Sequence, residues 1–330
     1  MSPPTLAVIR GAGWVDAAGP GSPTGPGPFR PGVEPLPRIR WQQVSDAPNP
    51  RFGRLDAFSR TGLLAVATAL KDAGLAKTGG AKRPVGIIAS TDLGCLGTDL
   101  DYYDTVLPQN GALASPNRFV YTLPNCFLGE AAIVFGFTGP GFVVNPGPDD
   151  PLAALAMALD WLSAGACPTM LAGFCDAPPP ELATAGVPAG AGFVVLERPP
   201  AQSSIDPPRG SGTFPEAGRA FCEGIPAPDT PLVTRCGSVQ ASETQDSAGE
   251  RNLIAAGCPQ GVPQEGAHHD CCPLEERARS RPTPSGASPF DATALRCHGG
   301  TWLLGETPVA SWHDLFTVLS TRPFPSGDAP

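Results

Sequence analysis

The chain has 330 residues, of which 41% are hydrophobic and 16% charged, and its formal net charge is −9. This length suffices for one large domain or two medium ones, while the acidic balance argues against a nucleic-acid partner. No apolar run approaches the length of a membrane span, and the N-terminus carries no secretory signal, so we expect a cytoplasmic protein that contacts no membrane.

The ten cysteines include no C-x-x-C pair, and in a cytoplasmic chain we expect reduced thiols. The one dense cluster of metal-binding residue types is His268–Cys272. Ligands this contiguous cannot easily all face one ion, so a solvated loop is the favoured interpretation. We therefore expect neither a metal nor a cofactor.

Strand and helix patterns alternate through the first 199 residues, which predicts a layered α/β domain. Leu6–Ile9 predicts a strand, Gly11–Gly13 a turn, Trp14–Val15 a short second strand, and residues 16–50 a loop. An apolar face predicts a helix over Leu55–Ala73. The other elements expected in this part are a strand at Pro84–Ala89, a turn at Ser90–Gly97, helices at Thr98–Val106 and Pro124–Phe135, a strand at Phe142–Val144, a helix from Pro151 to Gly165, and strands at Thr169–Ala172 and Ala191–Leu196.

The turn at Asn145–Asp150 joins the strand that ends at Val144 to the next helix. We expect Asp150 to be the N-cap of that helix and Pro151 its first residue. Many α/β enzymes place a nucleophile or bind an anion at such a turn, because the free N–H groups and the dipole of the helix point there. This turn contains no Cys, Ser, Thr or His.

Composition changes after Pro199. Residues 200–289 are rich in Pro, Gly and Ser, which predicts a largely irregular segment. Order is expected to return near Thr301–Leu304 and in a helix at Trp312–Leu319. We therefore divide the chain into residues 1–199, 200–289 and 290–330.

Several segments resemble β-ketoacyl synthases in the order in which that family carries them. They are Arg51–Arg60 with its R-x-D-x-x-S pattern, Val85–Gly94, Leu123–Asn125 followed by Phe135–Gly136 and Thr138–Pro140, Leu171–Gly173, and Gly190–Glu197. The resemblance implies a thiolase-like layered α/β fold, usually dimeric, that holds chains bound to acyl-carrier protein in a buried tunnel.

A weaker similarity to the last conserved stretch of the family covers Gly305–Thr307, Phe316–Leu319 and Arg322–Pro323. The family's second half is considerably longer than residues 200–330. The resemblance therefore implies a well-kept N-terminal half, residues 1–199, and a truncated or degenerate C-terminal half, of which residues 290–330 are the remnant.

The resemblance also locates the catalytic positions. A ketosynthase carries its nucleophilic Cys at the strand-to-helix turn, and the flanking segments align that position with Pro148. Proline supplies neither a nucleophile nor an N–H for an oxyanion. The family's Lys and His fall on Thr301 and Glu306. No Cys lies between Cys126 and Cys167, so a small shift in the alignment restores nothing, and we expect no condensation by this chain alone.

The resulting hypothesis is a non-catalytic subunit of the chain-length-factor type in type II polyketide or fatty acid biosynthesis, similar to aryl-polyene systems. It would pair with an active β-ketoacyl synthase, receive chains from acyl-carrier protein and shape the acyl tunnel. The residues predicted to form the interface are Tyr121, Leu123, Pro124, Asn125, Phe127 and Glu130. Glu130 is also compatible with a place in solvent, Cys126 is interpreted as a packed thiol, and His313–Asp314 as a surface pair.

Two alternatives stay open. A structural or scaffolding pseudoenzyme would bind acyl-carrier protein without shaping a product, and it would need no apolar cavity reaching a partner. A hydrolase or acyltransferase with a different nucleophile is the less favoured alternative.

Overall fold

A computed structural model describes the protein at residues 4–25, 27–30, 32, 35–76, 82–147, 150–179, 182, 187–199 and 293–321. The predicted irregular segment at 200–289, with its His268–Cys272 cluster, lies outside these residues. None of the helices that the structure describes is long and apolar enough to span a bilayer.

The described strands form one mixed sheet. They are β1 (Thr5–Asp16), β2 (Gly19–Gly21), β3 (Val85–Ser90), β4 (Gly141–Val144), β5 (Thr169–Asp176), β6 (Gly190–Glu197), β7 (Ala294–His298), β8 (Thr301–Leu304) and β9 (Thr307–Val309). Their order is β4-β3-β5-β6-β1-β7-β8-β9, with β2 paired to β1. β3 runs parallel to β4 and β5, whereas β6 runs antiparallel to β5 and β1.

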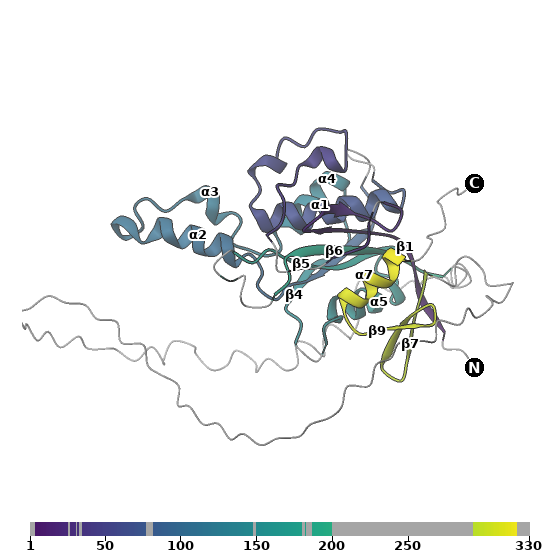
Figure 1. The fold of residues 1–330 in the computed structure, drawn as a ribbon. Helices are drawn as coiled ribbons and strands as arrows, with labels where there is room; N and C mark the ends of the chain where they lie inside the picture. Colours follow the sequence, from purple (N-terminus) through teal and green to yellow (C-terminus); the bar gives the residue numbers. More distant parts are fainter. Residues whose placement is uncertain are drawn as a thin grey trace, which may run out of the picture. The chain divides into compact units, whose positions relative to one another are not determined.

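Helices cover both faces of this sheet (Figure 1). The described helices are α1 (Ala57–Asp72), α2 (Leu96–Val106), α3 (Pro116–Phe119), α4 (Cys126–Phe135), α5 (Ala153–Ser163) and α7 (Trp312–Thr321), with 3-10 turns at Trp41–Gln43, Phe52–Arg54 and Pro108–Gly111. One apolar cluster joins α1 and α4 to the sheet, and a second joins α5 and α7 to it. This arrangement confirms the layered α/β class predicted from the sequence.

The strand β1 is continuous, so the predicted turn at Gly11–Gly13 is wrong. The two glycines serve packing instead. A Cβ on Gly13 would lie 2.2 Å from the amide nitrogen of Ala69, and one on Gly11 would lie 2.4 Å from that of Ala73. Because no side chain separates them, the backbone of α1 lies directly on β1.

Asp56 is the acidic residue of the R-x-D-x-x-S pattern, and the structure shows what its side chain does. As the N-cap of α1, it accepts a hydrogen bond from the Ser59 N–H through Oδ1, at 3.1 Å. Its Oδ2 accepts the hydroxyl of Thr98 at 2.7 Å. One carboxylate therefore starts α1 and holds the beginning of α2.

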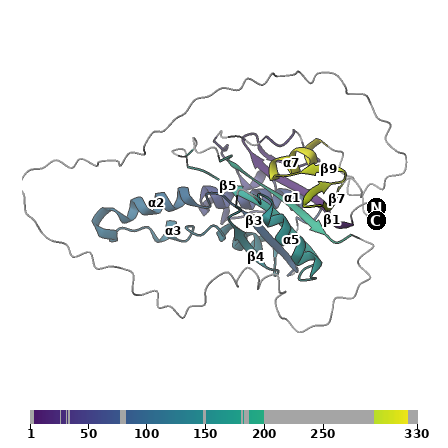
Figure 2. The same cartoon turned by 90° about the horizontal axis from the view of Figure 1, so that it is seen from below.

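The helices α2 and α3 extend away from the sheet (Figure 2), and neither has a buried residue. The rings of Tyr102 and Phe119 lie 5.4 Å apart, and Arg118 Nη1 donates to the Asp101 carbonyl at 2.6 Å. These contacts hold α3 against α2. We refer to residues 96–123 as the arm.

The first helix of the arm confirms the helix predicted at Thr98–Val106. The second, α3, has four residues, which is too short for a periodic pattern in the sequence.

The segment 293–321 extends the sheet at β1. β7 pairs antiparallel with β1 and places Leu295 opposite Ala7. α7 confirms the helix predicted at Trp312–Leu319, and β8 confirms the order expected at Thr301–Leu304. The indole N–H of Trp312 donates to the buried Ser90 Oγ at 2.9 Å, which ties α7 to the end of β3.

A buried carboxylate holds the turn that follows β3. Asp176, at the end of β5, is 5% exposed and accepts hydrogen bonds from the Thr91 hydroxyl (2.9 Å) and from the N–H groups of Asp92 and Leu93 (both 3.0 Å). Burial raises the pKa of Asp176 to about 6, and the hydrogen bonds oppose this shift.

This pKa predicts a pH dependence of stability. Because the folded-state pKa of Asp176 lies above the value of 3.8 for an exposed Asp, the folded protein binds the proton more tightly. The carboxyl's contribution to the free energy of unfolding is therefore largest below about pH 4 and falls by roughly 3 kcal/mol as pH rises through 6. We expect Asp176→Asn to remove this decline. Urea unfolding of wild type and variant at a series of pH values from below 4 to above 6 measures it, as the difference between their free energies of unfolding. Asp160→Asn, at an exposed carboxylate on α5, is the control, and equal pH slopes for wild type and Asp176→Asn would contradict the prediction.

Candidate functional site

The turn between β4 and α5 is fixed to the neighbouring turn by Asn145. Its side-chain amide donates to the carbonyls of Thr91 and Asp92, at 3.0 and 3.1 Å. Pro148, which the resemblance aligns with the nucleophile, lies outside the described residues. Its assignment therefore stays a prediction from the sequence.

The helix α5 begins later than predicted. Its N-cap is Leu152, not Asp150, and Pro151 lies in a turn before the helix. The side chain of Leu152 is buried in the core, and its backbone, at φ −104° and ψ 19°, is outside the helical region. The N–H of Ala153 donates to the Asp150 carbonyl at 3.1 Å, so Asp150 contributes its backbone to the turn before the helix and no side-chain cap.

A cavity of about 490 Å³ lies where the parallel strands β3, β4 and β5 end. Carboxyl ends of parallel strands meet at one edge of a sheet, which is where α/β proteins commonly bind ligands. We call this the strand-end cavity. Its lining residues are Phe29, Ser90, Thr91, Asp92, Pro146, Gly147, Pro151, Phe174, Asp176, Pro188, Ser311, Trp312 and His313.

The start of α7 supplies three of those residues, and sequence reasoning missed them. Asp314 accepts the Ala310 N–H at 3.0 Å and the Ser311 hydroxyl at 2.9 Å, while its own N–H donates to Ser311 Oγ at 3.2 Å. This reciprocal cap follows an S-x-x-D pattern that marks the helix start. His313 is exposed but borders the cavity, so interpreting His313–Asp314 only as a surface pair was incomplete.

Thr301 and Glu306 line neither of the cavities reported for the described residues. Thr301 pairs with His298 at the tip of the β7–β8 hairpin, and Glu306 is exposed in the turn before β9. The structure therefore does not bring these two residues to the strand-end cavity.

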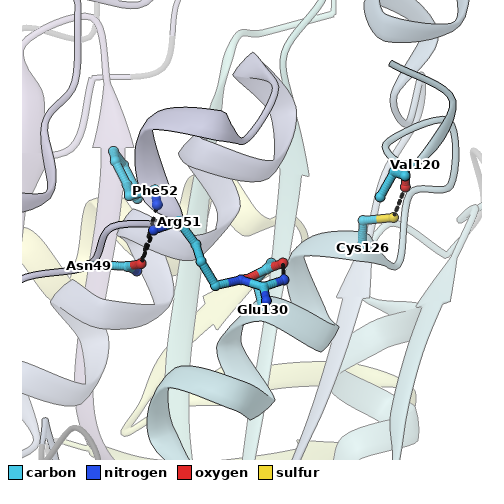
Figure 3. A network of polar contacts seen from close by, with 6 residues as sticks. All are labelled: Asn49, Arg51, Phe52, Val120, Cys126 and Glu130. Atoms are coloured by element: carbon cyan, nitrogen blue, oxygen red, sulfur yellow. Dashed lines mark hydrogen bonds and ion pairs between the residues drawn. The ribbon is translucent and has the colours of Figure 1, made fainter. Parts of the chain in front are cut away.

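Cys126 lies at the first position of α4 and donates through its thiol to the Val120 carbonyl at 3.0 Å (Figure 3). Partial burial raises the pKa of this thiol. A thiol with a raised pKa carries little thiolate at neutral pH, and the thiolate is the nucleophilic form.

Glu130 on α4 forms a two-pronged ion pair with Arg51 (Figure 3). Arg51 Nε donates to Oε2 at 2.9 Å, and Nη2 donates to Oε1. Glu130 is 7% exposed, so the alternative that it faces solvent is wrong. Asn49 Oδ1 accepts the N–H groups of Arg51 and Phe52, which steadies the arginine from the other side.

The predicted interface residues separate into two groups. Phe127 is fully buried between the rings of Phe58 and Phe193, at 5.5 and 6.0 Å, so its side chain belongs to the core and is unavailable to a partner. Glu130 is turned inward as well. Leu123, which is 60% exposed, and Asn125 face solvent. The other two, Tyr121 and Pro124, are half-buried.

Exposed apolar side chains gather on one stretch of the chain. Of the ten large apolar residues that the described part leaves exposed, nine lie between Leu100 and Phe142, and Leu6 is the tenth. We call these nine the apolar surface: Leu100, Tyr103, Leu107, Leu113, Phe119, Val120, Leu123, Ile133 and Phe142. The spacing of Leu100, Tyr103 and Leu107 along α2 is the signal in the sequence that could have indicated it.

A second cavity, of about 880 Å³, lies at the base of the arm. Its lining combines apolar side chains, among them Leu36, Phe58 and Leu100, with charged ones, and it borders Tyr121 of the predicted interface. The charged lining residues are Arg54, Asp56, Arg60, Asp101, Asp104 and Arg118. We call this the arm-base cavity.

Among the described residues, no group of three or more His, Cys, Asp or Glu side chains could hold a metal ion.

Comparison with solved structures gives weak overall similarity. The ishigamide ketosynthase/chain length factor has 17% identity and a TM-score of 0.48, with 62% of this chain and 64% of that chain covered. The type II polyketide synthase complex AntDE:AntF, an acyl-carrier protein with its ketosynthase bound to the hexaketide, has 20% identity, a TM-score of 0.48, and 58% and 62% coverage. The ketosynthase ApeO in complex with its chain length factor ApeC, from Xenorhabdus doucetiae, has 20% identity, a TM-score of 0.38, and 50% and 65% coverage.

The chain thus spans less than two thirds of the length of these solved chains. No curated protein sequence matches it. Residues 41–200 match the family model of the beta-ketoacyl synthase N-terminal domain, and this segment runs from the first 3-10 turn through β6. Over this segment, which is just under half of the chain, the protein is similar to the N-terminal domain of β-ketoacyl synthases.

Proposed function

We propose that this protein is a non-catalytic subunit of the chain-length-factor type, which pairs with an active β-ketoacyl synthase in type II polyketide or fatty acid biosynthesis. The observation that carries the proposal is the apolar surface. Large apolar side chains that stay exposed in such number along one stretch of the chain favour a site of association. Eight of its nine residues lie on the arm and α4, and Phe142 lies on β4.

The strand β4 supports the same assignment. It is at the edge of the described sheet, pairs only with β3, and has Gly141 and Phe142 exposed. An edge strand presents unpaired N–H and C=O groups, which a partner's strand can take up. The arm and this edge together offer a partner both apolar contacts and backbone hydrogen bonds.

The composition of the turn Asn145–Asp150, which has no Cys, Ser, Thr or His, supports a non-catalytic role. The chain has no Cys between Cys126 and Cys167, and Asn145–Gly147 contain no nucleophilic side chain. Burial raises the pKa of Cys126 and Cys167, which lowers the share of nucleophilic thiolate at either residue.

The arm-base cavity gives a chain-length role a place in this proposal. Its lining combines the apolar side chains of Leu36, Phe58 and Leu100 with three Arg and three Asp residues, and it borders Tyr121 of the predicted interface. In this proposal, acyl-carrier protein delivers chains to the partner ketosynthase, and the arm-base cavity bounds the space into which they grow.

Loss of apolar contact should weaken the pairing. We expect Leu107→Ser and Leu123→Ser each to lower affinity for an active ketosynthase partner by about tenfold or more, since burying such a side chain contributes about 1.5–3 kcal/mol. Size-exclusion chromatography with light scattering and titration calorimetry measure this. Leu6→Ser changes an exposed leucine outside the apolar surface and is the control. A chain that stays alone when mixed with the ketosynthase would refute the proposal.

Filling the arm-base cavity should shorten the product. Gly97 lines it, and a Cβ there would meet Pro179 at an ordinary 3.5 Å, so Gly97→Leu adds volume inside the cavity at low cost. We expect the reconstituted pair to release shorter acyl products while the complex still forms. Gly53→Leu, at a position with open space, is the control. An unchanged product length with an intact complex would favour the scaffold.

Incubation with an acyl thioester should leave the mass of the purified protein unchanged. The raised pKa values of Cys126 and Cys167 lower the nucleophilic thiolate at these two residues, and intact-protein mass spectrometry detects any acyl adduct. An active ketosynthase serves as the positive control. A stable adduct that Cys126→Ser abolishes would show that the chain has its own nucleophile.

A further inference from the structure

The strand-end cavity has an aromatic wall. Phe29, Phe174 and Trp312 line it, with the centroid of the Phe174 ring 6.2 Å from the centroid of each of the other two rings. The planes of Phe29 and Phe174 meet at 72°, and those of Phe174 and Trp312 at 32°. The three rings therefore form a corner and not a flat stack, which presents ring surface to the cavity from more than one direction.

The charge facing this wall is negative. Asp92 and Asp176 line the cavity, and none of its described lining residues is Lys or Arg. His313 on α7 is the one other titratable group in that lining. Neither carboxylate has a salt bridge among those found in the described residues. The cavity thus combines ring faces with carboxylates that no cationic side chain offsets.

The positive ends of the two helix dipoles at the cavity do not cancel the negative charge of its carboxylates. The N-termini of α5 and α7 each contribute about half a positive charge at most. At α7 the Asp314 carboxylate already accepts from the Ala310 N–H and the Ser311 hydroxyl, which neutralises that end. The two carboxylates of the cavity outweigh the remaining end of α5.

An anion or an apolar ligand fits this composition poorly. Carboxylates repel an anion at close range. An uncharged acyl group would cover the carboxylates, remove water from them and return no compensating interaction. A cation is attracted both by the faces of the aromatic rings and by the negative charge of the carboxylates.

The hydrogen bonds that Asp176 already accepts favour a cation that has no hydrogen-bond donor of its own. Its two oxygens already accept from the Thr91 hydroxyl and from the N–H groups of Asp92 and Leu93. It is therefore placed to act through its charge more than as an acceptor for a new donor. A fully alkylated ammonium group needs charge and ring faces but donates no hydrogen bond.

We propose that the strand-end cavity binds a small organic cation of the quaternary ammonium class. Its volume of about 490 Å³ suits a small molecule. Phe174 and Trp312 contact the alkylated nitrogen, and Asp92 lies at the mouth, where it is exposed. This site is independent of the apolar surface and of the pairing proposed above.

The test compares choline with 3,3-dimethylbutan-1-ol, in which a carbon replaces the charged nitrogen. Titration calorimetry and saturation-transfer NMR on the full chain measure binding. We expect choline to bind at least about tenfold more tightly than the uncharged alcohol, because the cation's interaction with rings and carboxylates is lost in the latter. Equal binding of the two, no binding of choline, or tighter binding of butyrate would overturn the proposal.

Variants locate the site. We expect Asp92→Asn and Phe174→Leu each to weaken choline binding by about three- to thirtyfold. Asp92 is exposed, so its substitution tests charge without disturbing the core, and circular dichroism checks folding of both variants. Asp150→Asn changes an exposed carboxylate that does not line the cavity and should leave binding unchanged. Binding that Asp92→Asn does not weaken, or that Asp150→Asn weakens equally, would place the cation elsewhere and overturn the proposal.

Discussion

The backbone contact between α1 and β1 is the constraint on which the rest of the structure depends. Glycines on β1 let the helix lie directly against the strand, where any side chain would meet helix backbone. β1 in turn pairs with β6 on one side and with β7 on the other. Twelve of the sixteen residues of α1 are buried, so this helix is enclosed by the sheet on one side and by α4 and neighbouring segments on the other. A displaced helix would disturb all of these layers together.

Polar contacts, by contrast, organise the ends of the parallel strands. Asp176 holds the turn after β3, and Asn145 joins that turn to the one after β4. Each of these bonds has a backbone N–H or C=O group as one partner, so substitution of other side chains in the two turns leaves them intact. The turn after β4 can therefore border the strand-end cavity without a thiol of its own.

Much of the fold was predictable from local pattern. The apolar runs of β3 and β6 and the periodic face of α1 each reflect burial that a short window of sequence reveals. The continuity of β1 was not predictable, because glycines that pack against a distant helix look the same in sequence as glycines in a turn. For the site, the exposure of Leu123 agrees with its place in the predicted interface segment. The burial of Phe127 and Glu130 was not predictable, because it depends on residues distant in the sequence. These are Phe58 and Phe193 for Phe127, and Arg51 for Glu130. The contribution of α7 to the strand-end cavity likewise arises only in three dimensions.

The bond between Trp312 and Ser90 joins groups 222 residues apart, and β7 pairs with a strand near the other end of the chain. Contacts of such high sequence separation form slowly, because a long loop must close before they are gained. During synthesis, the apolar side chains of the sheet that Phe316 of α7 contacts, among them Trp14 and Phe174, stay uncovered until residues 293–321 have left the ribosome. A chain in that state exposes an aggregation-prone surface. Its yield in a cell should therefore depend on chaperone capacity and on the rate at which its last segments are translated.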